Sequence, residues 1–514
     1  MINKMAQLRV RSAQSTRGAV RIALRVAGAT AIVLCAAHGI ASAQQTTPAT
    51  QAEPTAQVSP SPAPAPKNVL PSSFVNPYPF AMTKAGPLSF GAKFRAYDFI
   101  RINASQNAGN PNRQAFLPGA LLHVSLSPPG LAVPIEFAAT YVGAYNFGLD
   151  GVHPERRGVV DNTLPGFNLS SFGEAYVKVR LPRFTAALGN QFLNLPWLPS
   201  ADSRIKPVAF QGANIAYLAA PNLTLGVWRE TAFEGRTSSA FNRNTLITSS
   251  AAGANANPAH DTSGVLVGGF SYTNGSNVSV NGYYYDWYDI ARAAYADAKF
   301  TLAKANAPYV AVQYFTEGST GRAVAGRIAN DTYGFQIGAT PLRGLSASVG
   351  VDVVPARIAF VNATSAARAT AGLWVPIGGT PSAVAAGAGR YLVSYGGIAS
   401  PYTESYAADP LYTTSITAGA VDRRSSGNSI KGTLTYRTLD QRLVAIVSQA
   451  YYDYSNFAGA NTNAETGYDV TYFFNKVGKG PYRGLSLRER YADRKQPQLP
   501  YDFKYVRTQL EYSL

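Results

Sequence analysis

The chain almost lacks cysteine: Cys35 is the only one among its 514 residues. It lies in an N-terminal segment that we expect to be removed, so the rest of the chain can form no disulfide. Thiol catalysis and cysteine-ligated metal are thereby excluded.

Histidine and charge are also scarce. Charged residues make up 14% of the chain, against roughly 25% in soluble globular proteins. The histidines beyond the N-terminal segment, His123, His153 and His260, show no metal-ligand spacing. No serine-centred nucleophile turn and no phosphate-binding glycine loop has the strand-to-helix context that it needs. We therefore predict neither an enzyme nor a bound metal or cofactor.

Long apolar runs are absent except near the N-terminus. There, six basic and no acidic residues precede the run 26–37, and Ala41-Ser42-Ala43 provides a small-residue cleavage pattern. The run is too short for a transmembrane anchor. We predict a signal peptide over residues 1–43, and an exported chain without disulfides needs another source of stability, such as a closed β-barrel.

The expected mature chain is basic. Removing six of 45 basic residues leaves 39 against 28 acidic ones, a net charge of +11. Because an exported chain does not ordinarily meet nucleic acid, we expect anionic solutes or anionic lipid as partners. Residues 44–70 are rich in Pro, Ala, Thr and Ser, which predicts a disordered periplasmic leader before a barrel over residues 71–514.

From Leu88 onward, short stretches alternate polar and apolar residues, as strands of a membrane barrel do. Tight turns join these stretches in pairs, and long loops such as 150–170, 235–263 and 357–427 separate the pairs. The eight turns are 128–130, 182–183, 221–222, 276–277, 304–308, 342–344, 441–442 and 478–484. They imply sixteen strands, and 88–101 and 503–514 bring the total to eighteen, with both barrel ends on the periplasmic side.

The alternation also assigns faces to the strands. In 173–181, the apolar residues from Ala175 to Leu181 alternate with Tyr176, Lys178 and Arg180, so the first set is expected to face lipid and the second the lumen. The final strand alternates in the same way and resembles the signal read by the barrel-assembly machinery, although it ends in Leu514 rather than Phe. A cluster of aromatic residues is expected to belong mainly to the interfacial girdle: Tyr283, Tyr284, Tyr285, Trp287 and Tyr288. Alternate residues of a strand point inward, so a minority of the cluster could instead line the path and stack on sugars.

One loop differs from the others. Between Leu193 and Pro207 the chain carries three prolines, Trp197 and the charged residues Asp202, Arg204 and Lys206. We expect no strand ladder through this stretch. So stiff a loop between two barrel strands is predicted to fold inward and narrow the lumen.

The stretch FGEAYVKVRLPRFTAALGNQ, followed by SADSRIKPVAFQGANIAYL, resembles the OprD family of substrate-specific outer-membrane porins. Their third loop has the pattern D-x-R-hydrophobic-x-P-x-x-F-x-G, and FGAKFRAYDFIR, TGYDVTYFFN and GLSLRERYADR agree with the same family. The resemblance implies an eighteen-stranded barrel, an inward-folded third loop and a row of basic residues that guides carboxylates. The loop residues carry over as Asp202, Arg204, Pro207, Phe210 and Gly212.

Strand parity supports a basic row in the lumen. Arg488, Arg490 and Arg494 share one face of their strand, and each would cost roughly 2 to 4 kcal/mol if it faced lipid at mid-depth. The predicted substrate path comprises Arg488, Arg490, Arg494, Arg507, Lys431, Arg437, Lys178 and Arg180. The alternative is that these charges only solvate the pore and pair with Glu174, Asp469 or Glu511.

The working hypothesis is a channel in the outer membrane of a Gram-negative bacterium for passive, selective uptake of small carboxylates. Its constriction is assigned to Trp197, Asp202, Arg204 and Lys206. A general or sugar-selective porin and an adhesin-like barrel acting through its long loops remain alternatives. The sequence does not distinguish individual solutes.

Overall fold

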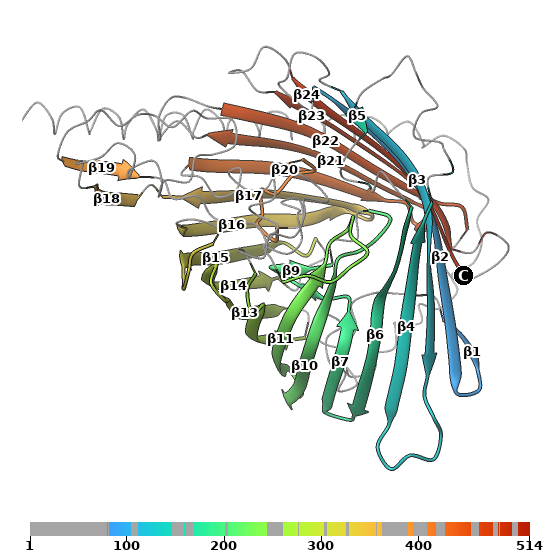
Figure 1. The fold of residues 1–514 in the computed structure, drawn as a ribbon. Helices are drawn as coiled ribbons and strands as arrows, with labels where there is room; N and C mark the ends of the chain where they lie inside the picture. The colour runs from blue at the N-terminus through green and yellow to red at the C-terminus, as the bar shows by residue number, and fades with distance from the viewer. Residues whose placement is uncertain are drawn as a thin grey trace, which may run out of the picture. The chain divides into compact units, whose positions relative to one another are not determined.

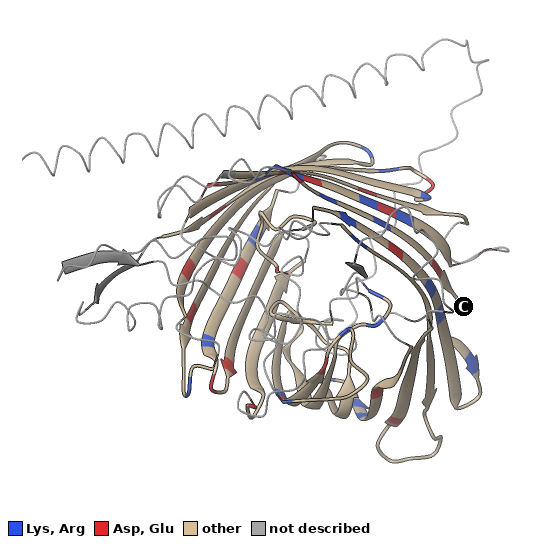
Figure 2. Cartoon of the chain, turned by 45° about the horizontal axis from the view of Figure 1, so that its top comes forward, with Lys and Arg blue, Asp and Glu red and all other residues tan. Residues whose placement is uncertain are grey.

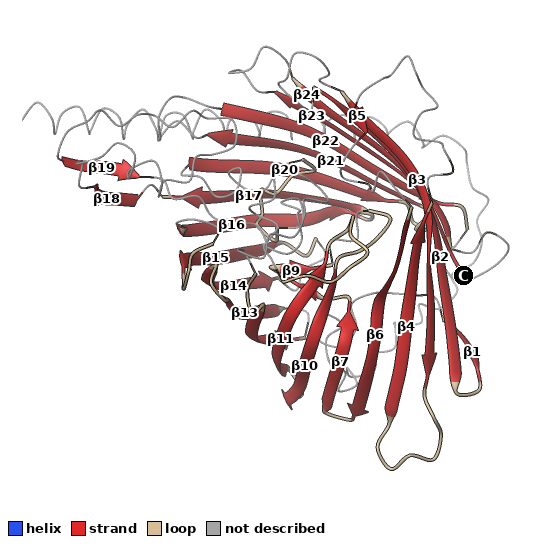
Figure 3. Cartoon of the chain, viewed as in Figure 1, coloured by secondary structure: helices blue, strands red, loops and turns tan. Residues whose placement is uncertain are grey.

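The structure is a computed structural model. It describes residues 80, 82–103, 112–145, 147, 159–160, 164, 168–200, 204–243, 261–275, 277–302, 306–324, 328–355, 357–361, 389–393, 409–417, 427–453, 462–475, 482, 484–495 and 502–514. The predicted signal peptide, the Pro-rich leader and Asp202 lie outside these residues. Within them every regular element is a strand, and no helix is long and apolar enough to cross a membrane (Figure 3).

Most of the described strands form one sheet that closes on itself and is antiparallel except for one short parallel pairing (Figure 1). Of its 20 strands, β1 (Thr83–Ala85) and β5 (Val159–Val160) are short additions to β2 and β3. The other eighteen form the barrel: β2 (Leu88–Ile102), β3 (Arg113–Leu126), β4 (Ile135–Ala144), β6 (Leu169–Leu181), β7 (Phe184–Gln191), β10 (Ala209–Ala220), β11 (Leu223–Glu234), β12 (Val265–Asn274), β13 (Val278–Trp287), β14 (Ala291–Thr301), β15 (Tyr309–Ser319), β16 (Ala329–Leu342), β17 (Leu345–Val354), β20 (Gly427–Arg437), β21 (Leu443–Asp453), β22 (Thr462–Phe473), β23 (Leu485–Lys495) and β24 (Phe503–Ser513). Each pairs with the next, and β24 pairs with β2, placing Ser513 opposite Lys93. The predicted eighteen-stranded barrel is confirmed.

All eight predicted tight turns lie between the strands that they were expected to join. Glycines with positive φ stand in three of them, Gly130 (77°), Gly344 (83°) and Gly484 (80°). A Cβ at Gly484 would lie 2.1 Å from the carbonyl oxygen of Ser513 in β24. A larger residue there would strain the turn and collide with the neighbouring strand, so glycine permits the close approach of β23 to β24.

The two faces of the wall have opposite character. On β6, Val177 and Leu181 on the outer face are 41% and 42% exposed, whereas Tyr176 and Lys178 on the inner face are buried. On β24, Leu510 is exposed and Arg507 is buried. A soluble protein shows the reverse arrangement. An apolar outer face and a polar inner face are those of a barrel in lipid, as the alternation predicts.

The third loop contains more regular structure than its prolines suggested. Within it, β8 (Asn194–Leu195) pairs with β9 (Leu198–Pro199), so the expectation of no ladder was wrong. The missing N–H of Pro199 is tolerated because the next residue, Ser200, donates the closing bond to the carbonyl oxygen of Leu193 at 2.7 Å. In the long loop after β17, β18 (Arg357–Val361) and β19 (Gly389–Val393) form another hairpin.

Two short loops, after β13 and after β15, are bound to each other by Asp289 and Arg322. The backbone N–H of Arg322 donates to Oδ1 of Asp289 at 3.0 Å, and its Nε donates to Oδ2 at 3.1 Å. Val324 N–H donates to the carbonyl oxygen of Asp289 at 2.9 Å. We refer to these contacts as the Asp289 clasp.

The Asp289 clasp is expected to open in acid. The backbone N–H of Arg322, followed by its side chain, lowers the pKa of Asp289 below its ordinary value. The stabilisation is therefore complete above the ordinary pKa of about 4 and is lost as the pH falls through the lowered folded value. A spin label on Thr320→Cys should be immobile at neutral pH and mobile only in acid. In Asp289→Asn it should be mobile throughout, and an equally immobile label in that variant would contradict the assignment.

Candidate functional site

The third loop, between β7 and β10, extends into the barrel and packs on the wall made by β13, β14 and β15 (Figure 1). Trp197, at the tip of the β8–β9 hairpin, is fully buried. Its ring centroid lies 4.1 Å from that of Phe315 and 6.1 Å from that of Tyr295, and its backbone N–H donates to the Tyr285 hydroxyl at 3.3 Å. The predicted inward fold of this loop is confirmed.

The C-terminal part of the third loop, around Arg204 and Ile205, contacts a different part of the barrel wall, made by β2 and β3. Nη1 of Arg95 donates to the carbonyl oxygen of Arg204 at 3.2 Å, and the Arg204 guanidinium lies 4.5 Å from the centroid of the Phe99 ring. Ile205 is fully buried, and a Cβ at Gly119 would lie 2.5 Å from its side chain. The loop therefore crosses the lumen between two separate stretches of wall.

Lys206 anchors this loop. Its Nζ lies 3.2 Å from Oε2 of Glu234 and donates to the carbonyl oxygen of Gly235 at 2.8 Å. Both charged side chains are almost completely buried. The positive charge of Lys206 is therefore used to hold the loop against the end of β11.

Replacing Lys206 by Met should destabilise the barrel, because Glu234 would remain buried without its partner. Removing one member of a buried pair typically costs about 3 to 5 kcal/mol. We expect a loss of this order in the free energy of unfolding, measured by urea titration in lipid vesicles. The double variant Lys206→Met/Glu234→Gln should recover much of it, and an undiminished stability of the single variant would show that the pair does not anchor the loop.

A second segment, residues 409–417 of the long loop, also lies against the lumenal wall, which the sequence gave no reason to expect. Thr413 donates to Oδ2 of Asp352 from its backbone N–H at 2.8 Å and from its hydroxyl at 2.6 Å. The Tyr452 hydroxyl donates to the carbonyl oxygen of Thr413 at 2.9 Å. Leu411 joins the apolar cluster around Trp197. Two inward segments thus share one packed region.

This packed region makes one side of the lumen apolar. It contains Tyr283, Tyr285 and Trp287 of β13, which are buried on the inner face, while Tyr284 is 49% exposed on the outer face. The prediction that most of the cluster belongs to the girdle was therefore wrong, because Tyr283, Tyr285 and Trp287 point inward as alternate residues of the strand. Their rings form a stack, with centroids 5.0 Å apart between Tyr285 and Trp287, and support the third loop.

The other side of the lumen is charged, and Figure 2 shows basic and acidic positions gathered on the wall of C-terminal strands. Arg488 and Arg490 of β23 share one carboxylate, that of Asp469 on β22. Arg488 donates from Nε to Oδ1 at 2.7 Å and from Nη2 to Oδ2 at 2.6 Å, and Arg490 donates from Nε to Oδ2 at 2.6 Å. The Asp469 side chain is 9% exposed, against 30% for Arg488 and 21% for Arg490. The two arginine side chains are thus more exposed than the Asp469 carboxylate that they share.

Two further arginines extend this surface, which we call the arginine wall: Arg488, Arg490, Arg507 and Arg95. Arg490 stands directly opposite Arg507 of β24 in the strand register. Nε of Arg95 lies 2.9 Å from Oε2 of Glu511. Like charges directly opposite each other destabilise a sheet, but here Arg490 is paired with Asp469. Arg507 is buried, with its guanidinium 5.8 Å from the centroid of the Tyr97 ring and 5.7 Å from that of Phe99.

The remaining members of the predicted row on this side lie around the arginine wall. Nε of Arg494 is 3.5 Å from Oε2 of Glu465. Lys431 of β20 donates to the carbonyl oxygen of Thr414 in the inward segment. Arg437 lies at the turn end of β20, opposite Val444.

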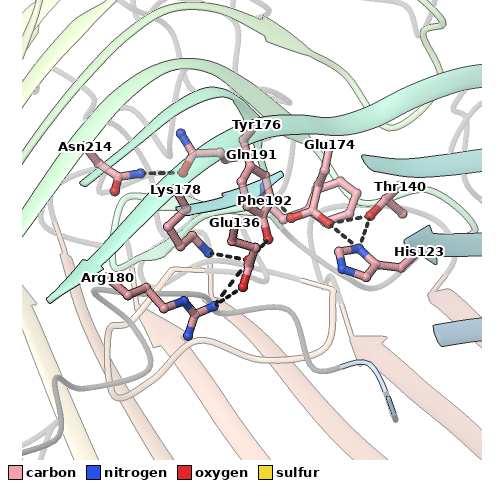
Figure 4. Close-up of polar contacts among 10 residues, drawn as sticks. All are labelled: His123, Glu136, Thr140, Glu174, Tyr176, Lys178, Arg180, Gln191, Phe192 and Asn214. Atoms are coloured by element: carbon pink, nitrogen blue, oxygen red, sulfur yellow. Dashed lines mark hydrogen bonds and ion pairs between the residues drawn. The ribbon is translucent and has the colours of Figure 1, made fainter. Parts of the chain in front are cut away.

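Lys178 and Arg180 belong to a different network (Figure 4). Both converge on Glu136 of β4, with Lys178 Nζ 3.9 Å from Oε1 and Arg180 Nη2 3.1 Å from Oε2. The Tyr176 hydroxyl donates to Oε1 of the same carboxylate at 3.2 Å. Four strands separate β6 from β23 around the barrel. The structure therefore does not bring these two residues together with the arginine wall.

Glu174 does not neutralise the basic row either (Figure 4). Its Oε2 accepts a hydrogen bond from the Thr140 hydroxyl at 2.5 Å, and His123 Nδ1 lies 2.7 Å from that hydroxyl oxygen. Its Oε1 accepts one from the backbone N–H of Phe192 at 3.4 Å. Glu174 thus fixes the start of the third loop. Of the three carboxylates considered as partners of the row, Asp469 pairs with Arg488 and Arg490. Glu511 pairs with Arg95, which the predicted row does not include.

A closed barrel with an apolar outer face, a charged lumen and an inward-folded loop defines an outer-membrane porin. Residues 134–350 match the family model described as outer membrane porin, OprD family. The match runs from β4 to β17 and includes the third loop, and it confirms the predicted resemblance. The fold, and the family that residues 134–350 match, are those of channels in the outer membrane of Gram-negative bacteria. A search of curated proteins gives no significant match.

Solved structures show the same fold. Pseudomonas aeruginosa OccK9 (OpdG) is 18% identical with a TM-score of 0.62, and the alignment covers 83% of this chain and 98% of that one. P. aeruginosa OpdK, solved with vanillate, is 16% identical with a TM-score of 0.61 and the same coverage. P. aeruginosa OccK2 (OpdF), in complex with glucuronate, is 13% identical with a TM-score of 0.61, covering 83% of this chain and 96% of that one.

Proposed function

We propose that the protein is a passive channel for selective uptake of small solutes that carry a carboxylate. The observation that carries the proposal is the arginine wall, in which Arg488 and Arg490 lie two residues apart on one face of β23 and are 30% and 21% exposed. Because both side chains stay partly exposed while they share the carboxylate of Asp469, we assign their remaining donors to the solute.

The chemistry of the wall suits a carboxylate. A guanidinium offers a fork of donors that matches the two oxygens of a carboxylate, whereas lysine offers a point charge. Several moderate sites in sequence also let a solute leave as readily as it enters, as conduction requires. Vanillate and glucuronate, found with two structures of the same fold, both carry a carboxylate.

The apolar packing restricts the route. The third loop and the 409–417 segment cover the lumenal side of β13–β15 and part of β17, so the solute would pass along the arginine wall. Export would depend on the signal peptide predicted over residues 1–43. Assembly would depend on the barrel-assembly machinery, with membrane lipid around the apolar outer face.

The test measures the zero-current potential of single channels in a planar bilayer under a tenfold KCl gradient, and then the chloride current as increasing amounts of benzoate are added. The proposal predicts anion selectivity and a chloride current that benzoate reduces in a saturable way. Weak selectivity without saturation would support a general porin. Assembled barrels without conductance steps would support an adhesin and contradict a channel.

A further inference from the structure

We propose that Asp469 is a positioning residue that holds Arg488 and Arg490 together, so that the two guanidiniums bind one carboxylate as a single site. The inference rests on the proposed function and assigns a role to a residue that does not itself bind the solute. It changes the expected path, because these two arginines would act together rather than one after the other.

The hydrogen bonds of Asp469 carry the first step. Its two oxygens accept three bonds, two from Arg488 and one from Arg490, and both arginines use Nε. An arginine has five N–H donors. Within the described residues, these bonds use Nε and Nη2 of Arg488 and only Nε of Arg490. Terminal N–H groups of both arginines are therefore available to a solute.

The second step is the difference in burial. Asp469 is 9% exposed, less than half as much as either arginine. A solute reaches the guanidiniums more easily than it reaches the carboxylate. Asp469 thus binds the Nε side of each guanidinium, and the remaining N–H groups of the two arginines stay accessible from the lumen.

The third step is electrostatic. Asp469 is paired in register with Arg490, which stands opposite Arg507 on its other side. Arg488 and Arg490 lie two residues apart on one strand, roughly 6 to 7 Å between Cα atoms. Guanidiniums at this spacing repel each other and would separate without a shared anion. The carboxylate of Asp469 provides that anion and fixes both side chains.

The same contacts also allow Asp469 the opposite role, that of a competitor of the solute. Asp469 would act as a competitor if it occupied the donors that a solute needs, and its removal would then strengthen solute binding. The two roles differ in the sign of the effect. Simple electrostatics also predicts stronger anion binding when a negative charge is removed, so weaker binding would be specific to positioning.

The experiment uses Asp469→Asn in the full-length channel, reconstituted in planar bilayers, with benzoate as the probe. The measured quantity is the benzoate concentration that halves the chloride current. We expect this concentration to rise about tenfold, the effect of losing roughly one charge-assisted hydrogen bond. Asp469→Glu, which keeps the charge, should restore part of the affinity.

The matched control is Asp297→Asn. Asp297 also carries one negative charge and lies on the inner face of β14, where Asn281 donates to it at 3.0 Å. This variant makes the same change in net charge away from the arginine wall, and its affinity for benzoate should not fall. Equal conductance steps in both variants will show that the barrels have assembled, and Asp469→Glu serves if the Asn variant does not assemble.

Several results would overturn the proposal. Tighter benzoate binding in Asp469→Asn establishes the competitor role and overturns the proposal, as does unchanged binding. An equal loss in Asp297→Asn overturns it too, because the effect would then not depend on the shared carboxylate. If benzoate has no effect on the parent channel, the proposed function itself fails and the inference fails with it.

Discussion

Replacing both Arg488 and Arg490 by Gln is expected to cut carboxylate uptake at low ionic strength by at least about tenfold. The double variant removes two charges and two donor forks from the arginine wall, and each charge-assisted hydrogen bond contributes about 1.5 to 3 kcal/mol. The barrel itself should still assemble, because lumenal positions tolerate polar substitutions and the glutamine amides keep N–H donors for Asp469. Uptake of benzoate into proteoliposomes, at 10 mM and at 300 mM salt, measures the effect. The difference should shrink at the higher salt as screening increases.

The chain offers a matched control in Lys178→Gln/Arg180→Gln. This variant also removes two positive charges that converge on one carboxylate, that of Glu136, but four strands away from β23. Its uptake should change much less. An equal loss in both double variants would mean that only net charge matters. Undiminished uptake in Arg488→Gln/Arg490→Gln would mean that these arginines only solvate the pore, and a general porin would then replace the selective channel.

Deleting residues 196–202 is expected to enlarge the conductance several-fold and to weaken selectivity. The deletion removes the tip of the β8–β9 hairpin with Trp197, whose ring lies 4.1 Å from Phe315. The rest of the loop would lose its attachment to the wall of β13–β15 and would no longer narrow the lumen. The size of single-channel steps in 1 M KCl measures this directly.

Two point variants test the anchor without shortening the loop. Trp197→Ala leaves a cavity, which typically costs about 3 to 5 kcal/mol for a buried aromatic residue, and should give noisy, larger steps. Trp197→Phe keeps a ring in the site and should behave almost as the parent. If the deletion leaves the step size unchanged in an assembled barrel, the narrowest point lies elsewhere, and the 409–417 segment becomes the next candidate.

The barrel could be predicted from the sequence because its signals are local. Each tight turn carries its own short polar or glycine-containing signal, and the alternation along each strand assigns its faces without knowledge of its neighbours. The inward position of Arg488 and Arg490 follows from the same parity.

Partners across the lumen could not be predicted in this way. Lys206 was assigned to the constriction because it lies in the loop, but its charge is buried against Glu234, on a strand that follows another strand and turn. Tyr285 and Trp287 were assigned to the girdle because aromatic residues are common there. The third loop covers them instead, and no local pattern shows where a loop of this length comes to rest.

The roles of the acidic residues of the site could not be predicted from the sequence either. Asp469 was considered only as a neutralising partner, and its bonds to two arginines depend on the register of β22 with β23. Asp352 holds the 409–417 segment, whose sequence has no strand pattern or recognised motif. Strand register and loop packing are properties of the closed barrel, so they appear only when the barrel is assembled.

The central claim is that the channel selects a solute by its carboxylate, and the most direct measurement compares benzoate with benzamide. The two molecules have nearly the same size and shape and differ in charge. In proteoliposomes at low ionic strength, benzoate should enter faster than benzamide through the parent channel, and the advantage should disappear in Arg488→Gln/Arg490→Gln. Equal entry of the two solutes through the parent channel would contradict the claim.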